Sequence, residues 1–216
     1  MGSPDQRKNM VTVIKLERQG KGRYEASFDN GIKTGLYRSE AAQLGIEEGT
    51  VLSEDQYQFL LKEVIGKRAK KRALHLLEQM DRTEMQLMEK LRAGGYPECC
   101  VEEAVSYVKK YHYLDDFRYA CTYIRTHQEK LGRQQLQQKL AGKGIRRDLA
   151  ERALETEYVS EDSAKIRELL VKRRFDPETS DEKEFSRTYA FLMRRGFSGN
   201  EVLREMKNYR ESSSCR

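Results

Sequence analysis

The sequence contains no tryptophan and only 3 prolines among its 216 residues. No apolar run approaches the roughly 18 residues that span a membrane, and no signal segment opens the chain, so we expect a soluble, cytoplasmic protein. Charged residues make up 35% of the chain and hydrophobic residues only 38%. A composition this rich in Lys, Arg, Glu, Leu and Gln favours an elongated helical protein over a sandwich or barrel.

Cysteine and histidine are too few and too scattered to suggest a metal site or a disulfide framework. The 4 cysteines lack the paired spacing of zinc ligands, and the 3 histidines lie far apart, so we predict reduced thiols, no metal and no cofactor. These residues are Cys99, Cys100, Cys121, Cys215, His75, His112 and His127. The sequence also lacks a phosphate-binding glycine loop, a nucleophile elbow and a nuclease-like cluster, so we expect no enzymatic activity. Asp115 and Asp116 could bind a metal, but adjacent acids at a helix start are more typical of capping.

Positive charge is concentrated in residues 117–147, which hold 8 Lys or Arg against one acid, Glu129. The formal net charge of the whole chain is +6, so the charges elsewhere nearly cancel. Cations with so few acidic neighbours in the sequence indicate a polyanionic partner, because they have little internal ion pairing. The alternative is an ordinary solvated helix face, which usually carries mixed signs. The candidate nucleic-acid or filament-binding residues are Arg125, Lys130, Arg133, Lys139, Lys143, Arg146 and Arg147. A second basic run, residues 67–72, has acids beside it, and we interpret it as helix surface.

The N-terminal part is predicted to be β-rich. Alternating segments surround the turn formers Gly20 and Gly22, and the pair Asn30-Gly31 predicts a hairpin turn in which both residues have positive φ. Three strands of this size need a cover, which a helix near residues 39–44 and the start of the next element could supply. Ser53 and Gln56 form a capping box that predicts the start of that next helix.

Three segments that contain a glycine stop can be aligned, and they indicate an internal repeat. They are KLRAGGYPECCVEEAV from Lys90, KLAGKGIRRDLAERAL from Lys139 and FLMRRGFSGNEVLREM from Phe191. Gly95, Gly144 and Gly196 coincide, at spacings of 49 and 52 residues, and are predicted to end helices in the left-handed conformation. The expected helices cover residues 67–79, 84–93, 98–111, 116–128, 133–142, 148–158, 161–174, 182–195 and 199–210. Helix starts are predicted from three pairs, namely Thr83 with Gln86, Asp148 with Glu151 and Ser198 with Glu201.

These patterns together predict a mainly α protein. Three tandem three-helix repeats should form an elongated, curved array, because neighbouring units bury each other's apolar faces, and a small β-rich domain should precede them. The expected divisions are residues 1–9 (disordered or a tag), 10–52 (β-rich domain), 53–66 (start of a connecting helix), 67–116, 117–160 and 161–210 (the three repeats) and 211–216 (a flexible tail).

The middle repeat also carries a family pattern. The stretch YLDDFRYACTYIRTHQEKLGRQQLQQKLAGKGI, residues 113–145, resembles the RecX regulatory proteins of bacteria. The matching positions are Tyr113, Leu114, Asp115, Asp116, Tyr119, Ala120, Lys130, Gly132, Leu140, Lys143, Gly144 and Ile145. Two departures are Arg133, where many members carry proline, and Leu131, between the lysine and the glycine. The resemblance covers the three helical repeats, and the N-terminal part is similar to that of longer members from Gram-positive bacteria.

The resemblance implies a regulator that binds RecA filaments on single-stranded DNA. It implies inhibition of ATPase, strand-exchange and coprotease activities, in the setting of DNA repair, recombination and the SOS response. We expect a monomer without a membrane partner, with double-stranded DNA as a second candidate ligand. Two alternatives stay open: a stand-alone helical-repeat module that binds nucleic acid, and a helical adaptor for an acidic protein.

Overall fold

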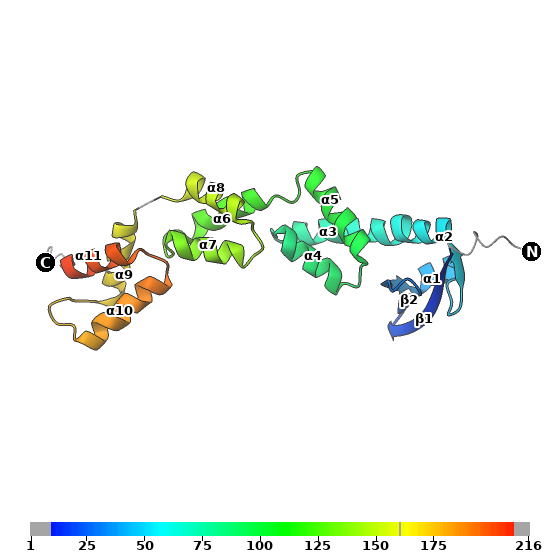
Figure 1. Cartoon of the computed structure of the whole chain (residues 1–216), viewed down its shortest axis with the longest axis horizontal. Helices are drawn as coiled ribbons and strands as arrows, with labels where there is room; N and C mark the ends of the chain where they lie inside the picture. The colour runs from blue at the N-terminus through cyan, green and yellow to red at the C-terminus, as the bar shows by residue number, and fades with distance from the viewer. Residues whose placement is uncertain (1–9, 160, 210–216) are drawn as a thin grey trace, which may run out of the picture. The chain divides into compact units, whose positions relative to one another are not determined.

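The computed structural model describes residues 10–159 and 161–209. That part of the chain is mainly helical, with a small antiparallel sheet near its N-terminus (Figure 1). The chain divides into two compact units, Met1–Asp115 and Asp116–Arg216. The predictions made for residues 1–9 and 210–216, including Cys215, fall outside the described residues. None of the described helices has both the length and the apolar character that crossing a membrane requires.

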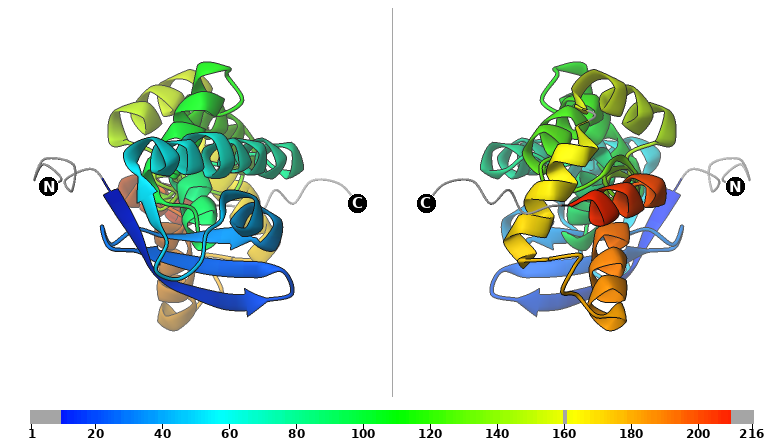
Figure 2. Two further views of the ribbon diagram at one scale, coloured as in Figure 1. Left: turned by 90° about the vertical axis from the view of Figure 1, so that its right-hand side faces the viewer. Right: turned by 90° about the vertical axis from the view of Figure 1, so that its left-hand side faces the viewer.

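The sheet of the first unit has four strands in the order β3-β2-β1-β4, one more than predicted. The strands are β1 (Met10–Gly20), β2 (Arg23–Phe28), β3 (Lys33–Tyr37) and β4 (Val51–Ser53). They are drawn in shades of blue in Figure 2, where β1 and β2 lie side by side. The missed strand, β4, pairs with the start of β1 through only three residues. A segment of three residues is too short to show an alternation of apolar and polar residues, so this strand could not be predicted from the sequence.

The connection between β2 and β3 differs from the predicted two-residue turn. Ser27 is opposite Lys33, and Gly31 is the position in the loop with a positive φ, 81°. Asn30 is not in the left-handed region; its side chain accepts a hydrogen bond from the Ile32 amide at 3.1 Å and donates to the Tyr57 hydroxyl at 3.0 Å. Asn30 therefore holds the loop against the helix that contains Tyr57 instead of shaping a tight turn.

The cover of the sheet comes from α1 (Arg38–Leu44) and from a long helix made of α2 (Glu54–Phe59), η2 (Leu60–Gly66) and α3 (Lys67–Gln79). The predicted capping box is confirmed, because the Gln56 amide donates to Ser53 Oγ at 3.3 Å and the Ser53 amide donates to Gln56 Oε1 at 2.9 Å. The rings of Phe28 and Tyr57 meet edge-on at 5.2 Å, which joins sheet and helix in one core.

The middle segment of this long helix, η2, is a π-helix, which the sequence does not indicate. Its Leu61 carbonyl accepts a hydrogen bond from the Cys100 thiol at 3.4 Å. A Cβ on Gly66 would lie 2.9 Å from that same carbonyl oxygen, so glycine permits the wider turn at this point.

The remaining helices match the predicted boundaries to within two residues. They are α4 (Glu84–Ala93) and α5 (Glu98–Lys110), which follow α3; α6 (Asp116–His127), α7 (Arg133–Ala141) and α8 (Arg147–Glu157); and α9 (Asp162–Arg173), α10 (Glu182–Arg194) and α11 (Gly199–Asn208). The two sets of the second unit have separate hydrophobic clusters, one around Ile124 and Leu140 and one around Phe175 and Phe197. The fold prediction of three three-helix repeats behind a small sheet is confirmed.

The glycine stops are confirmed, since Gly95, Gly144 and Gly196 have φ values of 79°, 82° and 81°. The predicted helix starts are confirmed only in part. Thr83 and Gln86 form the expected capping box. Ser198 is the N-cap of α11 but makes no side-chain capping bond. The prediction for Asp148 is wrong, because α8 already begins at Arg147, and the Asp148 carboxylate pairs with Arg146 instead.

Candidate nucleic-acid interface

The seven predicted binding residues all lie in the repeat formed by α6, α7 and α8. Their positions are the last turn of α6 (Arg125), the loop after it (Lys130), the two ends of α7 (Arg133, Lys139), the α7–α8 turn (Lys143, Arg146) and the first residue of α8 (Arg147). All are exposed except Lys143, which is half-buried. The residues therefore cluster at helix ends and turns of one small module.

Helix α7 is oriented by the apolar residues that it buries. Leu136 and Leu140 are fully buried, and Ile145 folds back so that its amide donates to the Leu140 carbonyl at 3.1 Å. This packing leaves Arg133 and Lys139 exposed on the outer surface. The sequence thus places these two cations in water through ordinary helical periodicity.

Between α7 and α8 lies a cleft of about 400 Å³. Its lining comprises Gln137, Gln138, Ala141, Ile145, Arg147 and Ala150. Two amides and a guanidinium are groups that hydrogen-bond phosphate and sugar oxygens. Arg147 therefore lies at the wall of a cleft, and the sequence alone did not predict this cleft.

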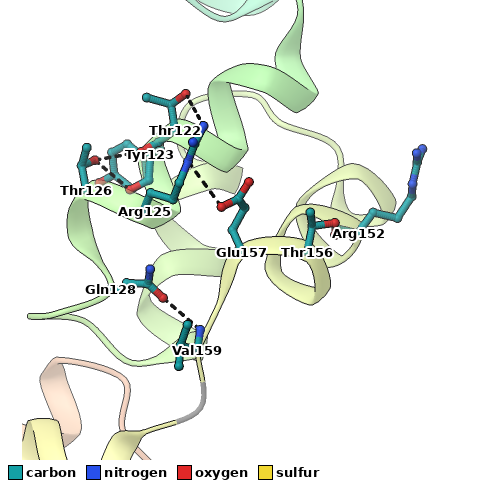
Figure 3. Close-up of polar contacts among 9 residues, drawn as sticks. All are labelled: Thr122, Tyr123, Arg125, Thr126, Gln128, Arg152, Thr156, Glu157 and Val159. Atoms are coloured by element: carbon teal, nitrogen blue, oxygen red, sulfur yellow. Dashed lines mark hydrogen bonds and ion pairs between the residues drawn. The ribbon is translucent and has the colours of Figure 1, made fainter.

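Arg125, Arg146 and Arg147 have carboxylate partners, so the inference that the cations lack internal ion pairs is wrong for these residues. Arg125 Nε lies 3.3 Å from Glu157 Oε2. Figure 3 marks this ion pair with a dashed line. At the start of α8, Arg146 pairs with Asp148 and Arg147 with Glu151, each at 2.9 Å. The partners Asp148, Glu151 and Glu157 all follow Arg147, the last residue of the basic stretch. Helix α8 supplies the missing negative charge.

The ion pairs of Arg146 and Arg147 hold these two side chains only weakly, because both guanidinium groups are exposed to water. The side chains of Arg146 and Arg147 are 78% and 84% exposed. Exposed pairs contribute little to stability, so a phosphate group can replace the carboxylate at little cost. The hydrogen bond from Arg147 to Glu151 raises the pKa of the Arg147 guanidinium, which keeps its charge.

The other cations of the site differ in their surroundings. Within residues 10–159 and 161–209, Lys130, Arg133 and Lys139 form no ion pair. Lys143 Nζ lies 5.1 Å from the centre of the Tyr123 ring and 5.8 Å from that of Tyr119. Three exposed and uncompensated cations therefore form the strongest part of the predicted site.

Aromatic rings of α6 stack beside Lys143. Tyr119 and Tyr123 are nearly parallel at 6.4 Å, and Tyr123 stacks on His127 at 4.0 Å. All three rings are half-buried, and burial raises the pKa of the Tyr123 hydroxyl, although nearby Lys143 opposes this. The expected packing role fits these tyrosines, while Tyr113, expected to be exposed, is 55% exposed.

Two exposed cations of this repeat, Arg118 and Arg152, are absent from the predicted set. Arg152 lies on α8, and its guanidinium carbon is 5.1 Å from the centre of the Phe117 ring. Figure 3 shows its side chain directed away from Arg125 and Glu157. Arg118 lies inside the basic stretch 117–147 and Arg152 lies five residues beyond it, so both were visible in the sequence. As for metals, the described residues contain no group of three His, Cys, Asp or Glu that could hold an ion.

Comparison with known families matches the chain at three places. Residues 69–107 match the first three-helix domain of RecX, residues 115–154 the second and residues 160–204 the third. The chain belongs to the RecX family.

Individual relatives agree with this assignment. Regulatory protein RecX of Caldanaerobacter subterraneus subsp. tengcongensis is 28% identical over 190 residues, which cover 87% of this chain and 93% of the relative. Regulatory protein RecX of Vibrio parahaemolyticus is 30% identical over 136 residues, or 62% of this chain and 86% of the relative. A crystal structure of regulatory protein RecX aligns with a TM-score of 0.63 at 25% identity, covering 92% of this chain and all of that one. The RecX relationship therefore extends beyond the three helical repeats to most of the chain.

Proposed function

We propose that this RecX protein binds RecA filaments on single-stranded DNA and inhibits their ATPase, strand-exchange and coprotease activities. The observation that supports DNA contact is the group of exposed cations Lys130, Arg133 and Lys139 in the second repeat, which form no ion pair with any residue that the structure describes. Membership of a family of regulatory proteins supports a non-enzymatic role. In this proposal the repeats contact RecA subunits while the second repeat also contacts phosphates.

Filament ATPase measurements test the regulatory part. ATP hydrolysis by RecA on single-stranded DNA should fall as the protein is added, and strand exchange and coprotease activity should fall with it. Unchanged hydrolysis at saturating protein would reject the proposal. Capture of RecA without DNA separates the regulator from a stand-alone nucleic-acid-binding module, which needs no RecA contact.

Salt dependence tests the DNA contact. Each phosphate neutralised on a single strand contributes about −0.7 to the slope of log affinity against log salt. The triple change Lys130→Gln, Arg133→Gln and Lys139→Gln should therefore make the slope less steep by about 2. A matched control removes three exposed cations of the third repeat, Lys183, Arg187 and Lys207. If this control changes the slope as much as the triple variant, the second repeat is not the DNA contact.

The paired cations provide a finer comparison. Arg146 and Arg147 must exchange a carboxylate for a phosphate, so their net release of counterions is smaller than that of unpaired cations. Replacing both by glutamine should therefore alter the slope less, per charge removed, than the triple change does. Equal effects per charge would show that Asp148 and Glu151 do not compete with DNA.

A further inference from the structure

The first unit contains a cleft of about 580 Å³ that the predicted site does not include. It lies where β2 and β3 meet the turn between α4 and α5. The residues of its lining that matter here are Arg23, Glu25, Gly35, Tyr37, Arg72 and Tyr96. This volume is within the range of ligand pockets, roughly 300 to 1,000 Å³.

The walls of the cleft are fixed by contacts between residues far apart in sequence. The Gly35 amide donates to the Gly95 carbonyl at 3.2 Å, which joins the edge strand β3 to the α4–α5 turn. Arg68 donates to the Gly35 carbonyl from the helix side and pairs with Glu40 at 2.5 Å. Both backbone groups of Gly35 are therefore held, and the cleft is a built feature of the fold.

Gly35 leaves the floor of the cleft open. Its φ is not positive, so the backbone conformation does not require glycine. A Cβ at this position would meet no atom within 4 Å, so packing does not require glycine either. Antiparallel pairing places Glu25 opposite Gly35 and Arg23 opposite Tyr37. Side chains opposite each other point to the same face of a sheet, so a side chain at residue 35 would occupy the space among these three groups.

The lining combines free positive charge with an accessible aromatic ring. Arg23 and Arg72 are exposed, and in the described part of the chain neither forms an ion pair. The Tyr37 ring is 41% exposed and has the Arg68 guanidinium 4.9 Å and the Arg23 guanidinium 5.5 Å from its centre. The charge of Arg68 is already matched by Glu40, so Arg23 and Arg72 are the cations available to a ligand.

We propose that this cleft binds one nucleotide of a single-stranded nucleic acid, with the base stacked on Tyr37 and the adjacent phosphates bound by Arg23 and Arg72. Aromatic rings beside cations are the general means of holding unpaired strands. Glu25 favours a base over an acidic peptide, because a carboxylate repels acidic side chains but accepts a hydrogen bond from the exocyclic amine of cytosine. The inference rests on the proposed function, to which it adds a second DNA contact in the first unit.

The test uses the full chain and a fluorescein-labelled oligo(dC) of about 20 nucleotides, longer than one typical binding site. Gly35→Val fills the floor without removing charge, and it should weaken binding about fivefold or more with an unchanged salt slope. Arg23→Gln with Arg72→Gln should make the slope less steep by about 1.4. A matched control, Lys62→Gln with Lys71→Gln, removes two exposed cations of the same unit that do not line the cleft, and it should change neither quantity by a comparable amount.

Melting curves followed by circular dichroism show whether each variant folds. If Gly35→Val does not fold, Tyr37→Leu takes its place, since it removes the stacking surface from an exposed side chain. Normal binding by folded Gly35→Val or Tyr37→Leu would overturn the proposal, as would an equal loss in the lysine control. Poly-glutamate that competes with oligo(dC) on the native chain but not on Gly35→Val would assign the cleft to a protein and would also overturn it.

The outcomes separate this proposal from the function on which it rests. Binding that is lost in the second-repeat triple variant but retained in Gly35→Val removes the cleft and leaves the regulatory function intact. Binding that depends on the cleft, with no effect of the protein on RecA ATPase, retains the cleft and removes the regulatory function.

Discussion

Gly132, which precedes α7, packs directly against Gly196, which follows α10. A Cβ on Gly132 would lie 2.4 Å from the Gly196 carbonyl oxygen, and a Cβ on Gly196 would lie 2.3 Å from the Gln135 backbone nitrogen. The Gly132 amide donates to the Arg195 carbonyl at 2.8 Å, and the Arg195 guanidinium donates to the Lys130 carbonyl at 3.2 Å. The end of a third-repeat helix therefore holds the second-repeat loop that carries Lys130.

Alanine at either glycine should destabilise the second unit. Gly132→Ala forces two backbones apart, and such overpacking costs about 1 to 3 kcal/mol. Gly196→Ala adds the cost of a left-handed conformation at a φ of 81°, so it should lower the thermal midpoint further. Thermal unfolding followed by circular dichroism measures both.

The matched control for these glycines is Gly142→Ala. A Cβ at Gly142 would meet its nearest neighbour, the Gln138 carbonyl oxygen, at an ordinary 3.5 Å, and its φ is −63°. Alanine there should be neutral or stabilise by up to about 1 kcal/mol. Similar melting curves for all three variants would contradict a specific contact between Gly132 and Gly196.

The repeat predicts equivalent core positions. Leu91, Leu140 and Leu192 occupy the same place in the three repeats and are fully buried. Each change to alanine should cost about 2 to 5 kcal/mol, measured by urea denaturation. The control is Leu203→Ala in α11, which is 36% exposed and should cost about 1 kcal/mol or less. A loss at Leu203 as large as that at Leu192 would show that burial does not set these energies.

Removal of the α8 carboxylates should strengthen DNA binding. Asp148→Asn and Glu151→Gln free Arg146 and Arg147 from partners that compete with phosphate. Exposed pairs of this kind are weak, so the two changes together should raise affinity for oligo(dC) only about two- to fivefold at low salt. The single change Glu155→Gln, on the same helix but with no ion pair in the described chain, controls for net charge. An equal gain from Glu155→Gln and from Glu151→Gln alone would indicate a general electrostatic effect only.

Cys100 should resist thiol reagents while Cys99 reacts. Burial, together with neighbouring Cys99, raises the pKa of the Cys100 thiol to about 12, whereas Cys99 is exposed. In a chain carrying Cys215→Ser and Cys121→Ser, one thiol should react at pH 8, and the second should react only after unfolding. Rapid labelling of two thiols in the folded chain would contradict the burial of Cys100.

The raised pKa of Cys100 should make the protein less stable at high pH. An unfolded cysteine ionises near a pKa of about 8.5, below the folded value. The unfolded state therefore releases its proton first, and the free energy of unfolding should fall as the pH rises from about 8.5 towards 12. Cys100→Ala should remove this part of the pH dependence. A pH dependence that Cys100→Ala leaves unchanged would assign it to other groups.

The sequence was sufficient for the helices because their signals are local. Glycine at residues 95, 144 and 196 ends a helix through its own backbone freedom, and the apolar residue after it folds back onto the last turn. Together with apolar periodicity and capping residues, these signals located the helices of the repeats to within two residues. They failed at Asp148, where an arginine competes for the carboxylate, and at β4, which is too short for a pattern.

The candidate site could be predicted only in part, for a physical reason. Its seven cations do lie in one repeat, since they come from one stretch of sequence. Which of these cations form ion pairs with carboxylates cannot be predicted from that stretch, because Arg125 meets Glu157 only when α6 packs on α8. The contact of Gly132 with Gly196 likewise joins segments more than sixty residues apart.

The sequence by itself determined the repeat, the helix boundaries, the buried apolar positions and the excess of positive charge, because each depends on residues within a few turns of one another. Tertiary structure decided which cations remain free and where a cleft opens. Arg68 holding Gly35 shows why, since ion pairing and open space depend on distances between side chains that only the folded chain brings together.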